Sequence, residues 1–382
     1  MNNLNDAVKN LLTYIESESY RGYDPYDALL SPLFRFPFLR TNKTLQFYSQ
    51  QFVKRCPVNV RPLLLIHKGY NPVTLGLCIQ SYANLMLAFP EKKEEYQKRA
   101  VLLISELKSL VPKGFSGACW GYDFPWQARY AAIPAWQPTI VATGIITNAL
   151  YFFYKAAGFK EALELCKSAS GFVLNDLRRT YHGTSLCFSY SPFDEQQVYN
   201  ASAKAIRLLA QVYSETKDEK LVAPMKNAVD YIVNRQQPDG SWFYSDVGKW
   251  VDNYHTGYIL DCLDEYMNVA PDRNIRQNLQ NGFAFYKKNF FSPNGMPGLM
   301  INKYLPVDCT AAGQSLLTLV RFGDVQTALK TADWMIRNMQ SEKGFFYYRK
   351  GKYFTRKTSF MRWSNAWMFT GLTCLLMHIN KK

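Results

Sequence analysis

DNYHTGYILDCL (residues 252–263) is one of six apolar stretches that carry a small residue one or two helical turns from the start. The others are NPVTLGLCIQSY (71–82), QPTIVATGIITNAL (137–150), YNASAKAIRLLAQVY (199–213), DCTAAGQSLLTL (308–319) and NAWMFTGLTCLL (365–376). Their small residues lie 54 to 68 positions apart, and in four stretches a leucine follows six positions later. Because each stretch is apolar on nearly all sides, each is predicted to be a helix buried on several faces.

Between these stretches the sequence predicts a second set of helices, each with one apolar and one charged face. They lie near 91–110, 159–176, 218–236, 272–289 and 323–339, and the first of the set is expected near 44–54. This alternation predicts an all-α (α/α)6 barrel, a single toroid domain over 1–382 with 1–40 as an N-terminal arm packing on the barrel. An open solenoid of helical pairs is the alternative, although its repeats of about 34 to 47 residues are shorter.

Each connection from an outer helix to the next inner helix is rich in glycine and aromatic residues. Examples are GFSGACWGYDFPW (114–126), GTSLCFSYSPF (183–193), PDGSWFYSDVGKW (238–250) and KGFFYYRKGKYF (343–354). Their β-prone residues and glycines predict short strands or hairpins. All these loops precede inner helices, so they share one end of the barrel with the helix N-termini, which favour anionic groups. The functional site is expected at this end.

The charge balance favours an anionic partner. The chain has 45 Lys and Arg against 30 Asp and Glu, a net charge of +15. An acidic polysaccharide, a nucleotide-sugar or lipid pyrophosphate, an anionic membrane surface and nucleic acid all fit that charge. The densest basic cluster, residues 349–357, is interleaved with aromatic residues, as in some segments that bind single strands. Since no nucleic-acid module signature is present, the cluster is interpreted as a solvated loop and no nucleic-acid partner is expected.

The termini and cysteines predict a cytoplasmic protein. MNNLNDAVKNLLTYIESES (1–19) lacks the basic region and long apolar run of a signal peptide. No stretch approaches the 18 apolar residues of a membrane span. The eight cysteines include no C-x-x-C pair, and several fall in apolar helical stretches, where buried thiols are expected.

The segment Gln236-Gln-Pro-Asp-Gly-Ser-Trp242 resembles the Q-x-x-D-G-S-W turn of α/α-toroids in the six-hairpin glycosidase superfamily, a turn that terpenoid cyclases share. The resemblance implies a structural role, in which the glutamine caps an outer helix and the tryptophan packs against the next one. It implies architecture and leaves the chemistry open.

The whole chain also resembles a bacterial and archaeal family associated with surface-polysaccharide biosynthesis. The likeness is carried by GYDPYDALLSP (22–32), KRCPVNVRPLL (54–64), GACWGYDFPWQ (117–127), PAWQPTIVATG (134–144) and DGSWFYSDVGKWVDNYHTGYILDCL (239–263), and it covers about 20 to 375. It implies a carbohydrate context, with peripheral contact to membrane-bound glycan synthesis machinery as a further expectation.

Three residues are the predicted acid and base groups. Glycan chemistry commonly needs two such groups beside a sugar ring. Asp123 lies among aromatic residues, where desolvation would raise its pKa, although it could instead cap a turn or pair with Arg129. Asp252 and His255 open the fourth inner helix, where Asp252 could equally be a helix cap.

The predicted substrate-binding residues share two properties, aromatic rings that can stack on sugar and polar groups at inner-helix starts. They are Trp120, Tyr122, Trp126, Arg129, Tyr199, Asn200, Asn253, Asp308, Arg362 and Trp363. Arg129 and Arg362 would neutralise a uronate or phosphate. Asp308 could instead be the N-cap of the fifth inner helix. Asp24 and Asp27 either join this rim or anchor the N-terminal arm.

No metal or cofactor is expected. His255, Asp308 and Cys309 could converge, but no metal-ligand spacing is present. Nucleotide-binding glycine motifs and the D-x-D-D run of terpenoid cyclases are absent from the sequence. Two hypotheses remain open: an enzyme of polysaccharide biosynthesis that acts on an acidic glycan or glycolipid as a hydrolase, lyase or epimerase, and a non-catalytic glycan-binding or scaffolding subunit.

Overall fold

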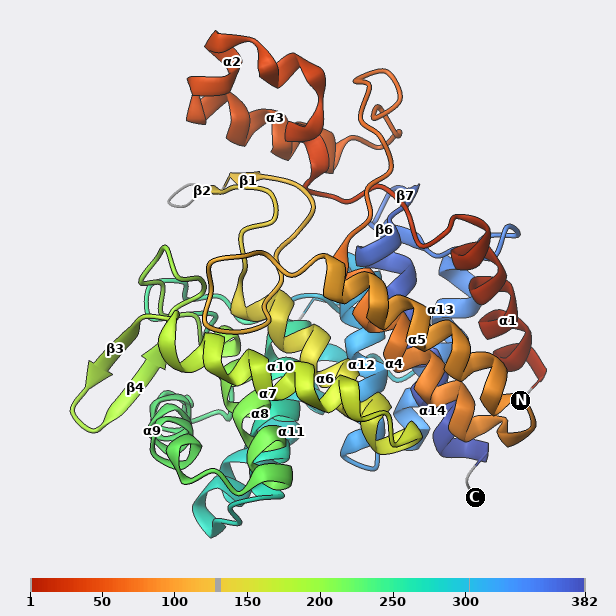
Figure 1. Cartoon of the computed structure of the whole chain (residues 1–382). Helices are drawn as coiled ribbons and strands as arrows, with labels where there is room; N and C mark the ends of the chain where they lie inside the picture. The colour runs from red at the N-terminus through yellow and green to blue at the C-terminus, as the bar shows by residue number, and fades with distance from the viewer. Residues whose placement is uncertain (1, 128–131, 302, 381–382) are drawn as a thin grey trace.

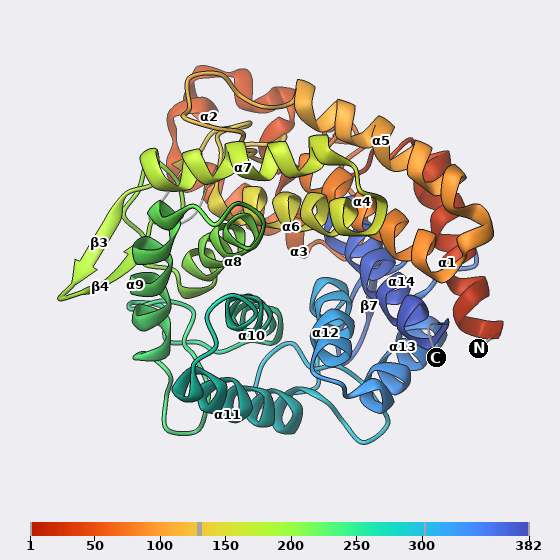
Figure 2. The same ribbon diagram turned by 60° about the horizontal axis from the view of Figure 1, so that its bottom comes forward.

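The computed structural model describes residues 2–127, 132–301 and 303–380. In this part of the chain the six apolar stretches form an inner ring of helices: α4 (Pro72–Ala88), α6 (Ile140–Ala157), α8 (Tyr199–Thr216), α10 (Asn253–Met267), α12 (Cys309–Arg321) and α14 (Trp367–Asn380). Each packs against the next, and α14 packs back against α4 (Figure 2). The ring is therefore closed, which confirms the (α/α)6 barrel and is incompatible with an open solenoid.

Small residues let neighbouring inner helices approach closely. A Cβ atom built on Gly144 of α6 would lie 2.7 Å from Cβ of Lys204 in α8. One built on Gly313 of α12 would lie 2.5 Å from the carbonyl oxygen of Trp367 in α14. Both positions are closer than packed side chains allow, so the repeated small residue of the sequence marks the contact between successive helices.

An outer ring surrounds these helices (Figure 2). Five of its members match the amphipathic segments predicted from the sequence: α5 (Lys93–Ser109), α7 (Lys160–Asn175), α9 (Val222–Val233), α11 (Arg273–Phe290) and α13 (Val325–Met339). The prediction of an outer helix near 44–54 is wrong, because α1 (Asn2–Ser17) fills that place by packing on α13 and α14. With α1 in the ring, residues 2–17 belong to the barrel itself.

Two equivalent turns show why α1 closes the outer ring. After α9, Gln236 donates from Nε2 to the carbonyl oxygens of Gly240 and Asn278, so it ties its own turn to α11. After α13, Gln340 donates from Nε2 to the carbonyl oxygens of Gly344 and Ala7, which ties that turn to α1. The same device therefore links α9 to α11 and α13 to α1.

Trp242 completes the first of these turns. Its Nε1 donates to the carbonyl oxygen of Ile232 near the end of α9 at 3.0 Å, and its ring packs against Gly282 of α11. The packing of the tryptophan on the next outer helix, implied by the Q-x-x-D-G-S-W resemblance, is thus confirmed, whereas the expected cap by the glutamine is wrong. The cap of the outer helix comes from Trp242, while Gln236 bridges to the next helix.

The long connections all lie at one end of the barrel. They carry the hairpin of β1 (Trp126–Gln127) and β2 (Ala132–Ile133), the hairpin of β3 (Arg179–His182) and β4 (Ser185–Phe188), and a sheet of β5 (Val307–Asp308), β6 (Tyr347–Lys350) and β7 (Thr355–Ser359). Residues 238–250 contribute a single bridge, between Ser245 and Val198, so the strand predicted there is wrong. Short turns at the other end include η3 (Pro90–Lys92) and η4 (Glu219–Leu221).

The connection from α1 to α4 is the longest. It contains the short helices η1 (Asp27–Leu30) and η2 (Pro32–Arg35) and a helical hairpin of α2 (Pro37–Thr41) and α3 (Lys43–Arg55). The α2–α3 hairpin stands above the loop-rich end of the barrel, beside β1 (Figure 1). The sequence segment expected to be an outer helix therefore stands over the end where the site was predicted.

Contrary to the prediction that no stretch approaches a membrane span, one of the described helices, α6, is long and apolar enough to cross a membrane by length and composition. It packs between α4, α7 and α8, and 61% of its residues in that window are buried inside the protein. Its position in the inner ring accounts for its apolar sequence.

Candidate functional site

A cavity of about 240 Å³ opens among the N-terminal ends of the inner helices. Its lining is mostly aromatic: Tyr26, Tyr122, Phe124, Trp126, Tyr190, Tyr244, Trp250, Tyr254, Tyr258, Trp363 and Trp367, with Val141, Ile145, Asn200, His255, Thr310 and Arg362. These residues come from five of the connecting loops and from the inner helices α6, α8, α10, α12 and α14. The cavity therefore exists only once the ring has closed.

The Asp252–His255 pair lies on one side of this cavity. Asp252 caps α10, because its Oδ1 accepts the backbone N–H of His255 at 3.0 Å. Its other oxygen, Oδ2, lies 2.6 Å from Nδ1 of the His255 ring. A carboxylate at Nδ1 holds the proton on that nitrogen, which leaves Nε2 as the basic nitrogen available to a ligand. One aspartate thus fixes both the helix start and the imidazole.

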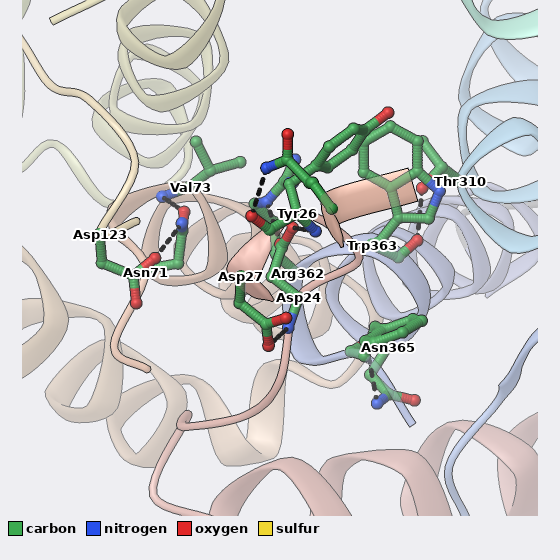
Figure 3. A network of polar contacts seen from close by, with 12 residues as sticks. Asp24, Tyr26, Asp27, Asn71, Val73, Asp123, Thr310, Arg362, Trp363 and Asn365 are labelled. Atoms are coloured by element: carbon green, nitrogen blue, oxygen red, sulfur yellow. Dashed lines mark hydrogen bonds and ion pairs between the residues drawn. The ribbon is translucent and has the colours of Figure 1, made fainter. Parts of the chain in front are cut away.

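Arg362 enters the cavity from a π-helical turn, η5 (Met361–Ala366), that leads into α14. Asp24 holds it in a bidentate ion pair, with Nε–Oδ2 and Nη2–Oδ1 distances of 2.7 and 2.9 Å. Both side chains are almost fully buried, and the pair lies at the centre of the polar network in Figure 3. Asp24 raises the pKa of Arg362 further above its usual range, so the guanidinium stays charged and presents its remaining N–H groups.

Trp363, the next residue of the same turn, is fixed by Asp308. Its Nε1 lies 3.3 Å from Oδ1 of Asp308, which also caps α12 by accepting the N–H of Thr310. Arg349 completes the arrangement with an ion pair to Asp308 Oδ2 at 2.5 Å. Asp308 is fully buried and outside the cavity lining, so the structure gives it the capping role and makes it a support for Trp363.

Tyr26, in the connection from α1 to α4, also lines the cavity. Tyr26 packs edge-on against Trp126 and Trp363, and Gln50 of α3 donates to its carbonyl oxygen at 2.7 Å. Asp27 turns away and accepts two hydrogen bonds from Nε of Arg61. Burial raises the pKa of Asp27 to about 7. Of the alternatives left open by the sequence, Asp24 and Asp27 therefore take the anchoring role, while Tyr26 reaches the cavity.

Among the binding residues predicted from the sequence, Tyr122, Trp126, Asn200, Arg362 and Trp363 line the cavity. Asn200 is almost fully buried, and its Nδ2 has no hydrogen-bond partner within the described residues. A buried amide donor left unpaired at a cavity wall is a ready partner for a ligand oxygen.

The other predicted binding residues lie elsewhere. Trp120 is buried and donates from Nε1 to the carbonyl oxygen of Leu107 at 2.8 Å. Tyr199 donates to Asp246 at 2.7 Å, and Asn253 bonds Gly298 and Tyr286 on the outer side of α10. Arg129 falls outside the described residues.

Asp123 lies beside the first inner helix and is not among the residues lining the cavity (Figure 3). Asn71, which caps α4, donates from Nδ2 to Asp123 Oδ1 at 2.6 Å. Burial is the main reason that the pKa of Asp123 is raised, to about 6. Its predicted acid role remains a prediction, because a raised pKa suits an acid while the position suits a support for Asn71.

Changing Asp123 to asparagine is expected to stabilise the protein at alkaline pH. The folded-state pKa of about 6 lies above the ordinary value of 3.8, so this carboxyl favours folding below about pH 4 and loses that contribution as the pH rises through 6. At pH 8 the variant should be more stable by on the order of 3 kcal/mol, with the difference nearly gone at pH 4. Urea denaturation at both pH values measures this. A more than hundredfold loss of turnover in the stable variant would assign Asp123 to the reaction.

Sequence reasoning missed the tyrosines and tryptophans that form most of the wall. Tyr254 and Tyr258 lie one turn apart on α10, and Tyr258 follows His255 by three positions, so helical spacing from His255 could have identified Tyr258. Tyr190, Tyr244 and Trp250 come from loops, where no periodicity applies. Burial raises the pKa of the Tyr254, Tyr258 and Tyr190 hydroxyls well above the usual value, so they remain neutral donors.

Within the described lining His255 is the one imidazole, and no Asp or Glu reaches the wall. The described residues contain no group of three His, Cys, Asp or Glu side chains that could hold a metal ion. Asp308 is occupied by Arg349, and Cys309 donates from Sγ to the carbonyl oxygen of Tyr347. The chemistry that these residues themselves can supply is proton transfer by His255 and stabilisation of negative charge by Arg362.

Comparison with known proteins bears on the fold. No family model matches the chain. A curated relative, the squalene–hopene cyclase of Zymomonas mobilis, is 29% identical over 192 residues, which cover 47% of this chain and 26% of that protein. This chain thus spans about a quarter of the length of the curated relative it matches.

Three solved structures have similar folds. Cellobiose 2-epimerase from Bacillus thermoamylovorans aligns with a TM-score of 0.62 and 13% identity, over 82% of this chain and 90% of that one. A family 76 glycoside hydrolase, an α-mannanase of Bacteroides thetaiotaomicron, aligns with a TM-score of 0.57 and 14% identity, over 80% of this chain and 85% of that one. A D-mannose isomerase aligns with a TM-score of 0.58 and 13% identity, over 80% of this chain and 86% of that one. These likenesses confirm the six-hairpin (α/α)6 toroid that the sequence predicts.

Proposed function

We propose that this protein is a carbohydrate-processing enzyme that moves a proton at the carbon next to a sugar carbonyl, as an isomerase or epimerase does. The observation that carries the proposal is the Asp252–His255 pair at the wall of an aromatic cavity that also contains Arg362. Aromatic rings such as Trp126 and Trp363 suit the apolar faces of a sugar ring. Similar folds in a cellobiose 2-epimerase and a D-mannose isomerase lend this reading support.

The proposed reaction starts with the open-chain form of an aldose. Nε2 of His255 removes the proton from C2, the electrons of that bond form a C1–C2 double bond, and the carbonyl electrons move onto O1. N–H groups of Arg362 stabilise the negative charge that develops on O1. His255 then returns its proton to C1 while the O2–H proton passes to O1, which gives the ketose. Return of a proton to the opposite face of C2 gives the epimer instead.

A single base favours isomerisation over epimerisation. Transfer between C2 and C1 can take place on one face of the enediolate, so one imidazole is sufficient. Epimerisation needs a second proton donor on the other face, and in the described lining that donor would have to be a tyrosine such as Tyr190. The main product is therefore expected to be a ketose.

Glycoside cleavage is less well supported by the same lining. Hydrolysis commonly requires two carboxyl groups on either side of the scissile bond. Asp252 is buried behind His255, and no carboxylate reaches the cavity from the described residues. The hydrolase and lyase alternatives would need a group from outside these residues.

A second candidate is polyene cyclisation, favoured by the match to a squalene–hopene cyclase and by the aromatic wall, which could stabilise a carbocation. Two features weigh against it. Cyclisation of this kind needs a strong acid to protonate an alkene, and the described wall has no carboxyl group. The cavity of about 240 Å³ is also smaller than the roughly 300–1,000 Å³ of pockets for drug-sized ligands.

The sugar can be neutral or acidic. Arg362 is the one cation of the described lining, and Asp24 already balances its charge. A neutral aldose therefore fits without further groups, while the acidic sugar expected from the net charge would have to share Arg362 with Asp24. A role in surface-polysaccharide biosynthesis and a cytoplasmic location are parts of the proposal that rest on the sequence.

Peripheral membrane contact is proposed through the α2–α3 hairpin. Phe38 and Phe52 are 70% and 66% exposed there, and residues 28–90 contain no Asp or Glu. Basic and aromatic side chains together suit an anionic lipid surface. Co-sedimentation with phosphatidylglycerol vesicles is expected for the wild type and should weaken at least tenfold in a Phe38→Ser/Phe52→Ser variant. Equal binding by both proteins would contradict this surface; Tyr353→Ser, in the exposed β6–β7 loop, is the matched control.

The proposed activity is tested by incubating the protein with D-mannose, D-glucose, cellobiose and D-glucuronate and following products by NMR. Conversion of one sugar to its ketose or 2-epimer, absent from a His255→Gln sample, is the expected result. Stabilisation against heat without conversion would favour the non-catalytic glycan-binding subunit. Neither binding nor conversion with any of the four would contradict the proposed function for these substrate types.

A further inference from the structure

A second cavity of about 250 Å³ lies between the inner helices and is lined mostly by residues of their middle and C-terminal turns. Ile145 and Trp367 line both this cavity and the aromatic one, so they form the boundary between the two. The proposed sugar reaction makes no use of it.

The two cavities differ in chemistry although the same helices build both. On α8, Asn200 faces the aromatic cavity, while Lys204, Arg207 and Gln211, on the following turns, face the second one. On α10, Tyr254 and Tyr258 likewise line the aromatic cavity, while Asp261 lines the second one. Amides of Gln80, Asn84, Asn148, Gln211 and Gln314 complete a polar wall.

Two cations at this wall lack hydrogen-bonded anions. Lys204 is 1% exposed, and its Nζ has no hydrogen-bond partner within the described residues. It lies 3.5 Å from the centroid of the Tyr258 ring, and burial lowers its pKa to about 7. Arg207 donates from Nη2 to the carbonyl oxygen of Gly144 at 3.1 Å, while its Nε is likewise unpaired in the described part of the chain.

The other charged groups of this cavity have partners, although one oxygen of Asp261, Oδ1, has none among the described residues. Lys155 pairs with Glu215, and Arg321 pairs with Asp264 and Glu265. Asp261 accepts a hydrogen bond from Gln314 Nε2 at 2.7 Å, and burial raises its pKa, which weakens its ability to balance Arg207. Burying a cation without an anion is costly, so Lys204 and Arg207 are retained at a cost to folding.

We propose that this cavity is a second ligand site, which binds a small hydroxylated anion such as a phosphorylated or carboxylated sugar. The anionic group is held by Lys204 and Arg207. The hydroxyls are held by the amide wall, where Asn84 Oδ1 and Gln211 Oε1 have no partner among the described atoms. The volume, below that of drug-sized sites, suits a monosaccharide.

The test is a titration of the full-length protein with glucose 6-phosphate, D-gluconate, inorganic phosphate and neutral glucose, followed by calorimetry and thermal unfolding. Either sugar anion should bind and raise Tm, and neutral glucose should bind this cavity at least tenfold more weakly. Binding by glucose 6-phosphate but not gluconate would identify a phosphate site. Binding by gluconate but not glucose 6-phosphate would identify a carboxylate site. Phosphate alone should bind more weakly than the sugar phosphate, because it leaves the amides unused.

Variants separate this site from the aromatic cavity. Lys204→Met should raise Tm in the absence of ligand, since it removes an unpaired buried cation, and should weaken anion binding at least tenfold. Arg207→Gln provides a second variant should the first fail to fold. Lys155→Met, on the same wall but already paired with Glu215, and His255→Gln should both retain binding, so this test is independent of the proposed isomerase activity. Absence of anion binding in the wild type, or unchanged binding in both Lys204→Met and Arg207→Gln, would overturn the proposal.

Discussion

Replacing His255 with glutamine is expected to lower turnover of the sugar substrate by about 10²–10⁴-fold, the usual contribution of a general base. The Nδ1 contact to Asp252 makes Nε2 the basic nitrogen, and glutamine has no basic nitrogen to offer in its place. The fold should survive, because the cap of α10 uses the backbone N–H of residue 255 and is kept. Steady-state kinetics with thermal unfolding of the same samples measures both effects.

His67→Gln is the matched control, since His67 is an exposed histidine away from the cavity, and its kcat should be unchanged. Asp252→Asn should also reduce kcat, because the amide cannot enforce the same tautomer of His255. Wild-type turnover in His255→Gln would rule out the proposed base, whatever the substrate.

Replacing Arg362 with methionine is expected to remove turnover and to destabilise the protein by about 3–5 kcal/mol, the cost of breaking a buried ion pair from one side. The loss arises because Asp24 would keep a buried charge whose bidentate partner is gone. Urea denaturation near neutral pH gives the stability change, and kcat gives the loss of oxyanion stabilisation.

The double variant Asp24→Asn/Arg362→Met separates the two roles of Arg362. Without a charge on either side, most of the lost stability should return, while turnover should not. If the double variant regained both stability and turnover, Arg362 would be a structural residue and the oxyanion role would be contradicted.

The fold could be predicted from the sequence because its information is periodic. Each inner helix repeats the same apolar pattern with a small residue at the contact to its neighbour, as at Gly144 and Gly313. The outer helices were equally visible except for the first, since α3 and α1 are both short amphipathic helices with no local feature to show which one packs on α13. Ring closure by α1 joins distant parts of the chain, as in the hydrogen bond between Gln340 and Ala7, 333 positions apart.

The site was less predictable because its residues meet only through the closed ring. Asp24 and Arg362 are 338 positions apart, and no spacing rule joins them. Acidic residues at inner-helix starts are ambiguous for a physical reason: the start of an inner helix needs a cap and also faces the cavity. Asp308 is used as a cap and a support, whereas Asp252 is a cap that also orients a cavity histidine.

Solvent exchange at C2 tests the central claim most directly, because proton removal by His255 precedes every later step. The protein would be incubated in D₂O with D-mannose or D-glucose, and deuterium at C2 and C1 followed by NMR. Because the proton that His255 holds exchanges with solvent before part of it returns to carbon, the account predicts deuterium incorporation by the wild type, even where net conversion is small, and its loss in His255→Gln. Binding of these sugars with neither exchange nor conversion in the wild type, or equal exchange in the variant, would contradict it.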